Sequence, residues 1–252
     1  MYRLIAYILF ALCLPVQAWA AVTMSSANFH YVQSGTATTG VCVLPTDVPS
    51  GGAIVILTVN RTNSSTAISS VGDPVNGTGY TAISAQTQAG GASGSTSFYR
   101  FTNSAALTGS ANRTVTVTWA GAVNNIVACG WLNSDQGAMT YDTKATDNNI
   151  TTTTTSWTSN SITTGSGNGV IMCGFGLVDA QSAAPTMTNS ETMLTAAAAT
   201  WPYFGGITFT GSTTRSCTAT LGTTARGLFY QTSFIEPASG AETFGFRRRL
   251  AQ

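Results

Sequence analysis

Histidine and lysine are almost missing from this chain of 252 residues, which has one of each, His30 and Lys144. Only 8% of its residues are charged. Most enzymatic chemistry uses ionisable side chains, and any Ser-His-Asp or Cys-His mechanism would have to use His30. Because His30 lies between Phe29 and Tyr31 in a strand-like segment, we interpret it as structural. We therefore predict a protein that is not an enzyme and has no catalytic residues.

Recognisable metal-binding patterns are also missing. One imidazole and scattered cysteines do not give the ligand spacing of a zinc site. The segment 141–149 contains Asp142 and Asp147 and could offer oxygen ligands to calcium, but Lys144 lies between them and the EF-hand spacing is absent. We predict a hairpin or loop edge there, and we expect no metal and no cofactor.

The chain has no large excess of positive charge. Ten Lys and Arg stand against nine Asp and Glu, and removal of Arg3 with an N-terminal segment would leave nine of each. Three of those nine positive charges are Arg247, Arg248 and Arg249, so residues 21–246 have six against nine, or −3. This balance argues against a nucleic-acid partner, which needs clustered positive charge. The basic tail alone could contact an acidic partner.

The N-terminus has the order of a secretory signal. Arg3 precedes an apolar run from Leu4 to Val16, and Ala18-Trp19-Ala20 supplies small residues for cleavage. We predict a signal peptide at 1–20 and a mature chain that begins at Ala21. The alternative is a membrane anchor, but the run is shorter than the roughly 20 residues that a spanning helix needs. We expect a secreted or cell-surface protein with no membrane span after cleavage.

Thr, Ser, Gly and Val dominate the rest of the chain in patterns of period two. The segment 113–119 alternates Thr with Val, Val and Trp, which is typical of a strand with one buried face. Further strand-length apolar runs lie at 53–59, 126–132, 170–178 and 227–235. Turn residues such as Gly72-Asp73-Pro74 and Asn76-Gly77 separate the runs. The pattern predicts an all-β, antiparallel β-sandwich as a single domain over 21–238, followed by a tail at 239–252.

Two segments are less regular. The segment 191–200 has fair helix propensity at Ala196 to Ala199, but its threonines and the following Trp201-Pro202 favour a loop or a short helical turn. The run of threonines at 151–155 precedes Ser156-Trp157-Thr158, which favours an exposed edge strand or an extended connection.

Four cysteines remain after removal of the signal, and they allow two disulfides in three possible pairings. Cys42 and Cys217 alternate with apolar residues near opposite ends of the domain. If the first and last strands lie side by side, their Cα atoms fall within bridging distance. We therefore predict a Cys42–Cys217 disulfide, with Cys129 and Cys173 either bridged or left as buried thiols.

A series of ordinary strand and turn segments, taken in order, supports a resemblance. The segments are Phe29 to Gln33, Val41 to Pro45, Gly51 to Ile56, Val71 to Tyr80, Ser97 to Phe101, Val115 to Trp119, Val127 to Trp131, Gly169 to Cys173, Thr218 to Leu221 and Phe234 to Ala238. Their order and spacing resemble a jelly-roll-like β-sandwich module found in bacteriophage structural proteins and in bacterial secreted or surface proteins. The resemblance implies a presentation or interaction domain without catalytic residues. The chain departs from the pattern in its longer turn after Asp73 and in its four cysteines.

Carboxylates and aromatic side chains are the remaining candidates for a site. Glycoside hydrolysis needs only two carboxylates, and nine are present: Asp47, Asp73, Asp135, Asp142, Asp147, Asp179, Glu191, Glu236 and Glu242. Most lie in turn contexts, where acidic residues cap and solubilise. Trp119 and Trp131 continue apolar strands and are predicted core residues. Trp157, Trp201 and Tyr203 are the predicted ligand-binding aromatics, with packing as the alternative role.

These observations favour an exported, non-enzymatic structural or adhesion module. We expect it to present loops to a cell-surface glycan or a protein partner, or to a second copy of itself. The alternatives are a carbohydrate-active enzyme of glycoside-hydrolase type and, from the resemblance alone, a surface component of a phage virion.

Overall fold

The computed structural model describes residues 22–61, 66–87, 94–177, 179, 183–195 and 202–237. The predicted signal peptide at 1–20 and the basic tail at 239–252 lie outside these residues. Within them, no helix is long and apolar enough to cross a membrane.

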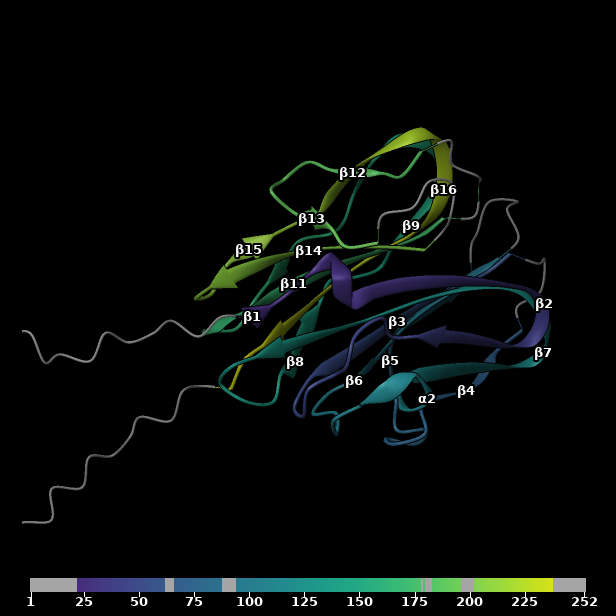
Figure 1. Cartoon of the computed structure of the whole chain (residues 1–252). Coiled ribbons are helices and arrows are strands. Elements are labelled where there is room, and N and C mark those ends of the chain that lie inside the picture. The colour runs from purple at the N-terminus through teal and green to yellow at the C-terminus, as the bar shows by residue number, and fades with distance from the viewer. Residues whose placement is uncertain are drawn as a thin grey trace, which may run out of the picture.

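Two seven-stranded antiparallel sheets pack against each other, which confirms the predicted all-β sandwich (Figure 1). The N-terminal half, residues 22–134, forms the first sheet from β1 (Val22–Thr23), β2 (Phe29–Val43), β3 (Ala53–Asn60), β4 (Ile68–Gly72), β5 (Thr81–Thr87), β6 (Ser95–Phe101) and β7 (Thr114–Ser134). The C-terminal half, residues 140–237, forms the second from β8 (Thr140–Lys144), β9 (Asn148–Thr158), β11 (Asn168–Leu177), β12 (Thr186–Met187), β13 (Thr192–Met193), β14 (Tyr203–Thr210) and β16 (Thr218–Ile235). Each sheet is therefore built from one continuous half of the chain.

Three short elements complete the described fold: a 3-10 helix η1 (Ser26–Asn28), a helix α2 (Gly109–Asn112) and a two-stranded pair of β10 (Ile162–Thr163) with β15 (Thr214–Arg215). The threonine-rich segment 151–155 is extended within β9, as expected, and β9 pairs with β16.

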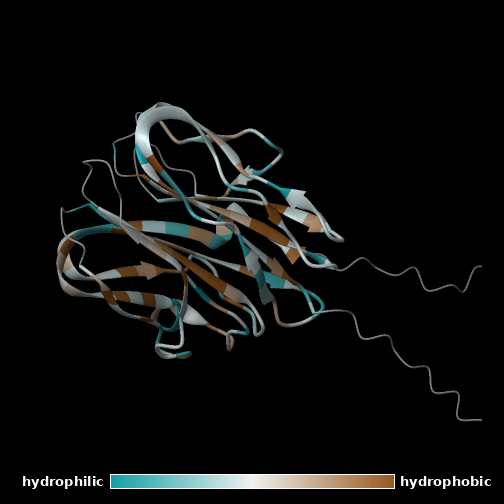
Figure 2. Cartoon of the chain, turned by 180° about the vertical axis from the view of Figure 1, so that it is seen from behind, coloured by the Kyte–Doolittle hydropathy of each residue, from teal (hydrophilic) through white to brown (hydrophobic). Residues whose placement is uncertain are grey.

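The central strands are apolar on both faces because each contacts two cores. In β3, Val55 and Leu57 belong to a core shared between the two sheets, whereas Ile54 and Ile56 belong to a core inside the N-terminal half. In β11 the alternation is the same, since Met172 enters the shared core and its neighbours enter a core of the C-terminal half. Figure 2 shows the hydrophobic residues concentrated in these stacked strands. Period-two alternation therefore separates two apolar environments here instead of core from solvent.

One long strand organises each half by pairing with different neighbours along its length. In the N-terminal half, β7 pairs with β2 along one edge, and with β4 and then β3 along the other. In the C-terminal half, β16 pairs with β9 and β8 on one edge, and with β12 and then β11 on the other. The outer strands β6 and β5 continue the first sheet in the same order as β14 and β13 continue the second. The two halves thus have the same topology.

The registers of the two halves also agree. Val117 on β7 lies opposite Val71 on β4, and Ala219 on β16 lies opposite Met187 on β12. Further along, Cys129 lies opposite Ile56 on β3, and Gln231 lies opposite Cys173 on β11. A shift of 102 residues along the long strands matches these positions, relating Val117 to Ala219 and Cys129 to Gln231. The shared strand order makes the two halves an internal structural duplication, which the sequence patterns did not indicate.

Corresponding residues of the two halves meet in the interface between the sheets. Phe98 on β6 and Phe204 on β14 are counterparts in the two halves, as their strand pairings show. Their ring centroids are 5.7 Å apart. Ser134 and Glu236, which the shift of 102 residues relates, share a hydrogen bond of 2.8 Å. Contacts between equivalent residues are the mark of a two-fold arrangement, so the halves pack about an approximate two-fold axis.

The disulfides lie within the halves, and the predicted Cys42–Cys217 pairing is wrong. Cys42 on β2 bonds Cys129 on β7, with Cα atoms 6.1 Å apart, and Cys173 on β11 bonds Cys217, with Cα atoms 6.2 Å apart. The prediction assumed that the first and last strands of one sandwich lie side by side. They belong to different halves here, and each half closes on its own cysteines.

Four positions around the disulfides correspond between the two halves, and each half forms its disulfide between a different pair of them. The positions are Cys42, Val115, Ile56 and Cys129 in the N-terminal half, and Ser159, Cys217, Cys173 and Gln231 in the C-terminal half. The hydroxyl of Ser159 donates to Oε1 of Gln231, so a hydrogen bond stands where the other half has its disulfide. Conversely, the buried pair Ile56 and Val115 corresponds to the second disulfide.

Non-reducing peptide mapping should link Cys42 to Cys129 and Cys173 to Cys217. The bridges span 87 and 44 residues, and loops of this size are worth about 4–5 kcal/mol in loop-closure entropy, with typical measured losses of about 2–5 kcal/mol. We expect each double Cys→Ala variant to lose stability in that range in denaturant unfolding. A Cys42–Cys217 peptide would contradict the fold.

The duplication predicts that a disulfide can be moved. In the C173A/C217A background, S159C/Q231C should form a bridge at the position that corresponds to Cys42–Cys129 and recover most of the lost stability. As a control, S156C/Q231C places one thiol on the exposed face of β9 and should keep two free thiols. Thiol titration and thermal unfolding give the result, and two free thiols in the first variant would contradict the assigned equivalence.

Candidate functional site

The structure buries two of the three predicted ligand-binding aromatics, so their predicted surface placement is wrong. Trp157 has no exposed surface and packs against Phe229 at 6.3 Å between ring centroids, and Tyr203 is only 1% exposed. The Thr and Ser residues beside Trp157 point outward because side chains alternate along β9. These polar residues therefore lie on the opposite face of β9 from Trp157. Trp201 lies outside the described residues.

The residues predicted to be core or structural are placed as expected. Trp119 and Trp131 are buried at 3% and 8% exposure. His30 lies exposed on β2 and stacks on Tyr31, with ring centroids 6.0 Å apart.

Three carboxylates of the described residues are held by separate structural partners. Asp47 pairs with Arg113 at 3.2 Å, Glu236 accepts from Ser134, and Asp179 pairs with Arg226 at 2.9 Å. The hydrogen bond from Arg226 holds the pKa of Asp179 below its ordinary value. These three carboxylates act as structural acceptors, and none of them lines the pocket described below.

The segment 141–149 forms strand β8 and the start of β9, which follow one another along the same edge of β16. It is therefore an edge segment, and the predicted hairpin is wrong because β16 is the partner of both strands. Asp142 accepts hydrogen bonds from the Gly165 N–H and the Ser233 hydroxyl. Asp147 accepts from Ser84 and lies 3.8 Å from Lys144. In the described part of the chain, no group of three or more His, Cys, Asp and Glu side chains could hold a metal.

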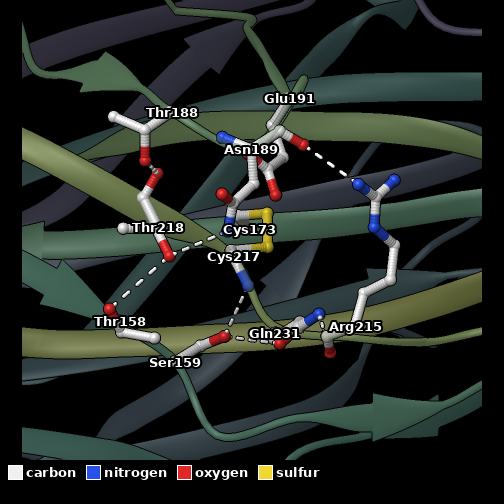
Figure 3. Close-up of a disulfide and its surroundings, with 10 residues drawn as sticks. All are labelled: Thr158, Ser159, Cys173, Thr188, Asn189, Glu191, Arg215, Cys217, Thr218 and Gln231. Atoms are coloured by element: carbon white, nitrogen blue, oxygen red, sulfur yellow. Dashed lines mark hydrogen bonds between the residues drawn. A yellow bond between two sulfur atoms is a disulfide. The ribbon is translucent and has the colours of Figure 1, made fainter.

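A polar pocket of about 470 Å³ lies in the C-terminal half, and three of its lining residues, Thr188, Asn189 and Arg215, lie beside the Cys173–Cys217 disulfide (Figure 3). Its volume falls in the range of about 300–1,000 Å³ that is usual for ligand pockets. Its lining comes from three separate segments and consists of hydroxyl, amide and guanidinium groups: Ser161, Thr188, Asn189, Ser190, Thr214, Arg215 and Ser216.

Local hydrogen bonds fix the rim of this pocket. Arg215 donates from a terminal guanidinium nitrogen to the carbonyl oxygen of Asn189 at 3.1 Å. The amide of Asn189 donates to the hydroxyl of Thr218 at 3.1 Å, and the hydroxyl of Thr188 donates to the Thr218 carbonyl at 3.3 Å. The short turn between β12 and β13 is thereby attached to the start of β16.

A buried polar network beside the disulfide supports the main chain of Arg215, which lines the pocket. Gln231 accepts from the Ser159 hydroxyl and donates from its amide nitrogen to the Arg215 carbonyl at 3.0 Å. The hydroxyl of Ser159 also accepts from the Cys217 N–H at 2.9 Å. Gln231 and Ser159 are 2% and 6% exposed. Satisfied buried networks hold one geometry, so the main chain of 215–217 is fixed from below.

In the N-terminal half, a longer turn corresponds to the one between β12 and β13. The Asp73 carboxylate accepts from the N–H groups of Val75 and Asn76 at 2.9 and 2.7 Å, and from the Tyr80 hydroxyl at 2.7 Å. Burial and this hydrogen bond raise the pKa of Tyr80 well above its ordinary value, so the phenol remains a donor. The longer turn noted in the sequence is therefore fixed by its own hydrogen bonds and by those of Asn76 with Ser104 and Ala105, and a smaller pocket of about 250 Å³ lies beside it.

Sequence reasoning did not find the residues of the pocket around Arg215. They come from positions 161, 188–190 and 214–216, which no spacing rule connects, and most are common residues of this chain. Arg215 was the available signal, because an arginine between Thr214 and Ser216 interrupts a long uncharged stretch.

Comparisons with known proteins identify no relative. No family model, no curated protein and no solved structure matches this chain.

Replacement of Gln231 with Ala should destabilise the protein by about 2–4 kcal/mol, because it leaves a small cavity and removes partners from Ser159 and from the Arg215 carbonyl. The exposed Thr220, on the same strand, provides a control, and Thr220→Ala should change stability by less than about 0.5 kcal/mol. Equilibrium denaturant unfolding measures both. Equal, small effects would contradict a structural role for the network.

Proposed function

We propose that the chain is an exported, non-enzymatic binding module that holds a cell-surface glycan in the pocket of the C-terminal half. The observation that carries the proposal is the pocket's lining of hydroxyls, an amide and a guanidinium, beside a buried network that supports the main chain of Arg215. Sugars offer hydroxyl donors and acceptors at close spacing, which such a lining complements. An adhesion or structural role on a surface would use this pocket for attachment.

Two further observations support this role. The disulfides Cys42–Cys129 and Cys173–Cys217 are compatible with an extracellular location, where such bonds persist. Glu191, the carboxylate close to the pocket, is 8% exposed and accepts from the Asn189 N–H. A hydrolase would need a pair of carboxylates across the open space, and the lining residues include none.

A glycan array, followed by calorimetry with the best ligands, tests the proposal. Thr188 is exposed on the pocket rim, so Thr188→Trp should fill the pocket and weaken binding at least about tenfold. Thr78 lines the smaller pocket of the N-terminal half, and Thr78→Trp should bind like the unaltered protein. Both variants should unfold at the temperature of the unaltered protein.

Three outcomes would contradict the proposal. Binding that survives Thr188→Trp would place the ligand elsewhere, and an array without ligands would remove the glycan assignment. Release of shortened products from a bound polysaccharide would identify a carbohydrate-active enzyme instead.

A further inference from the structure

The duplication gives this molecule an internal comparison for its pocket, because each pocket residue has a counterpart in the other half. The shift of 102 residues relates Arg215 to Arg113, which lies at the same point before the long strand. Thr188, whose N–H donates to the Thr218 carbonyl, corresponds to Gly72, which lies opposite Thr116. The next residues, Asn189 and Asp73, correspond in turn.

In the N-terminal half the arginine is neutralised. Nε of Arg113 lies 3.2 Å from the Asp47 carboxylate, and a terminal nitrogen donates to the Leu44 carbonyl at 2.8 Å. Asp73, the counterpart of Asn189, is a carboxylate that its own turn binds. Eight residues, 73–80, form that turn between β4 and β5. This half therefore leaves neither a free cation nor much space.

In the C-terminal half both acidic residues are missing. Arg215 has no carboxylate within 4.0 Å among the described residues, and the hydrogen bond of its guanidinium goes to the Asn189 carbonyl. Asn189 replaces the aspartate, and the turn between the corresponding strands, β12 and β13, has only four residues, 188–191. The pocket lies beside this shorter turn. Glu191 is held beneath this turn by the Asn189 N–H and does not line the pocket.

An arginine that lines a pocket and lacks an acidic partner is suited to a ligand that supplies the missing charge. The guanidinium is a planar fork of donors that matches a carboxylate in two parallel hydrogen bonds. One donor of Arg215 is used by Asn189, which also fixes the orientation of the group. The surrounding hydroxyls of Ser161, Thr214 and Ser216 are neutral partners for the rest of a sugar.

We propose that this pocket selects glycans that carry a carboxylate, with Arg215 as the residue that determines the preference. The inference rests on the proposed function and narrows its ligand class. The N-terminal half, in which Asp47 forms an ion pair with the corresponding arginine, has no such preference.

Matched pairs of ligands test the charge requirement. Oligogalacturonate and its methyl ester share one backbone and differ in charge, and sialyllactose and lactose form a second pair. We expect the acidic member of at least one pair to bind tenfold or more tightly than its neutral partner, as is usual for a charge-assisted hydrogen bond. The difference should shrink as salt is raised from 50 to 300 mM.

Variants assign the preference to one residue. Arg215→Gln keeps a polar side chain and should bind the acidic and neutral members equally. Arg113→Gln removes the corresponding arginine of the other half and should keep the full preference. Both variants are first checked for an unchanged circular dichroism spectrum and unfolding temperature, and Arg215→Lys serves as a second probe if Arg215→Gln unfolds.

The outcomes separate this inference from the proposed function. Equal binding of acidic and neutral members, lost in Thr188→Trp, would overturn the carboxylate preference and leave the glycan pocket in place. A preference that persists in Arg215→Gln would overturn the role of Arg215. Tighter binding of sulfated oligosaccharides than of every carboxylated one would replace carboxylate by sulfate. No binding by any member would contradict both proposals.

Discussion

Burial of the central strands on both faces is the constraint on which this fold depends. Strands β3 and β11 each send alternate side chains into the core of their own half and into the core shared between the sheets. Neither strand can tolerate a polar residue on either face without a partner. This requirement constrains the rest of the structure. In each half, one face of the central strand packs within that half, and the other face must remain available to pack against the second sheet. With so few charged residues available, apolar contact between layers supplies most of the stabilisation.

The duplication shows how similar frames can carry different local solutions. Each half has one disulfide among the same four positions, but one uses Cys42–Cys129 and the other uses Cys173–Cys217. At the remaining pair of positions the N-terminal half has apolar side chains and the C-terminal half has the Ser159–Gln231 hydrogen bond. One cross-link is present within each half, and its position differs between them. In the same way, a long turn in one half corresponds to a short turn beside the pocket in the other.

The strands were largely predictable from the sequence, and the connections between them were not. Runs such as 53–59 and 170–178 are apolar because they are buried, and a buried strand is readable from composition and length. The duplication could not be predicted from the sequence, because corresponding residues such as Cys129 and Gln231 occupy the same position in their sheets but are chemically different. Without knowledge of the duplication, the cysteines were paired on the assumption that the first and last strands of one sandwich lie side by side, and that pairing was wrong. Trp157 was wrongly predicted to lie on the surface because its polar neighbours lie on the other face of β9. The pocket was missed because it assembles from three distant segments that only the packing of the C-terminal half brings together.

The positions of the two disulfides also determine how the molecule responds to force. A chain pulled from its ends can lengthen only through residues that no covalent bond bypasses. The bridges bypass 87 and 44 residues, more than half of the span from 22 to 237. At about 3.5 Å of extension for each residue, most of the contour length that unfolding would normally release is withheld. The pocket beside Cys217 lies at the boundary of one such loop, and the adjoining main chain is tied to β11 by a bond that tension cannot readily break. Tension on a ligand bound there would therefore pass through the Cys173–Cys217 disulfide and not through the residues that it bypasses.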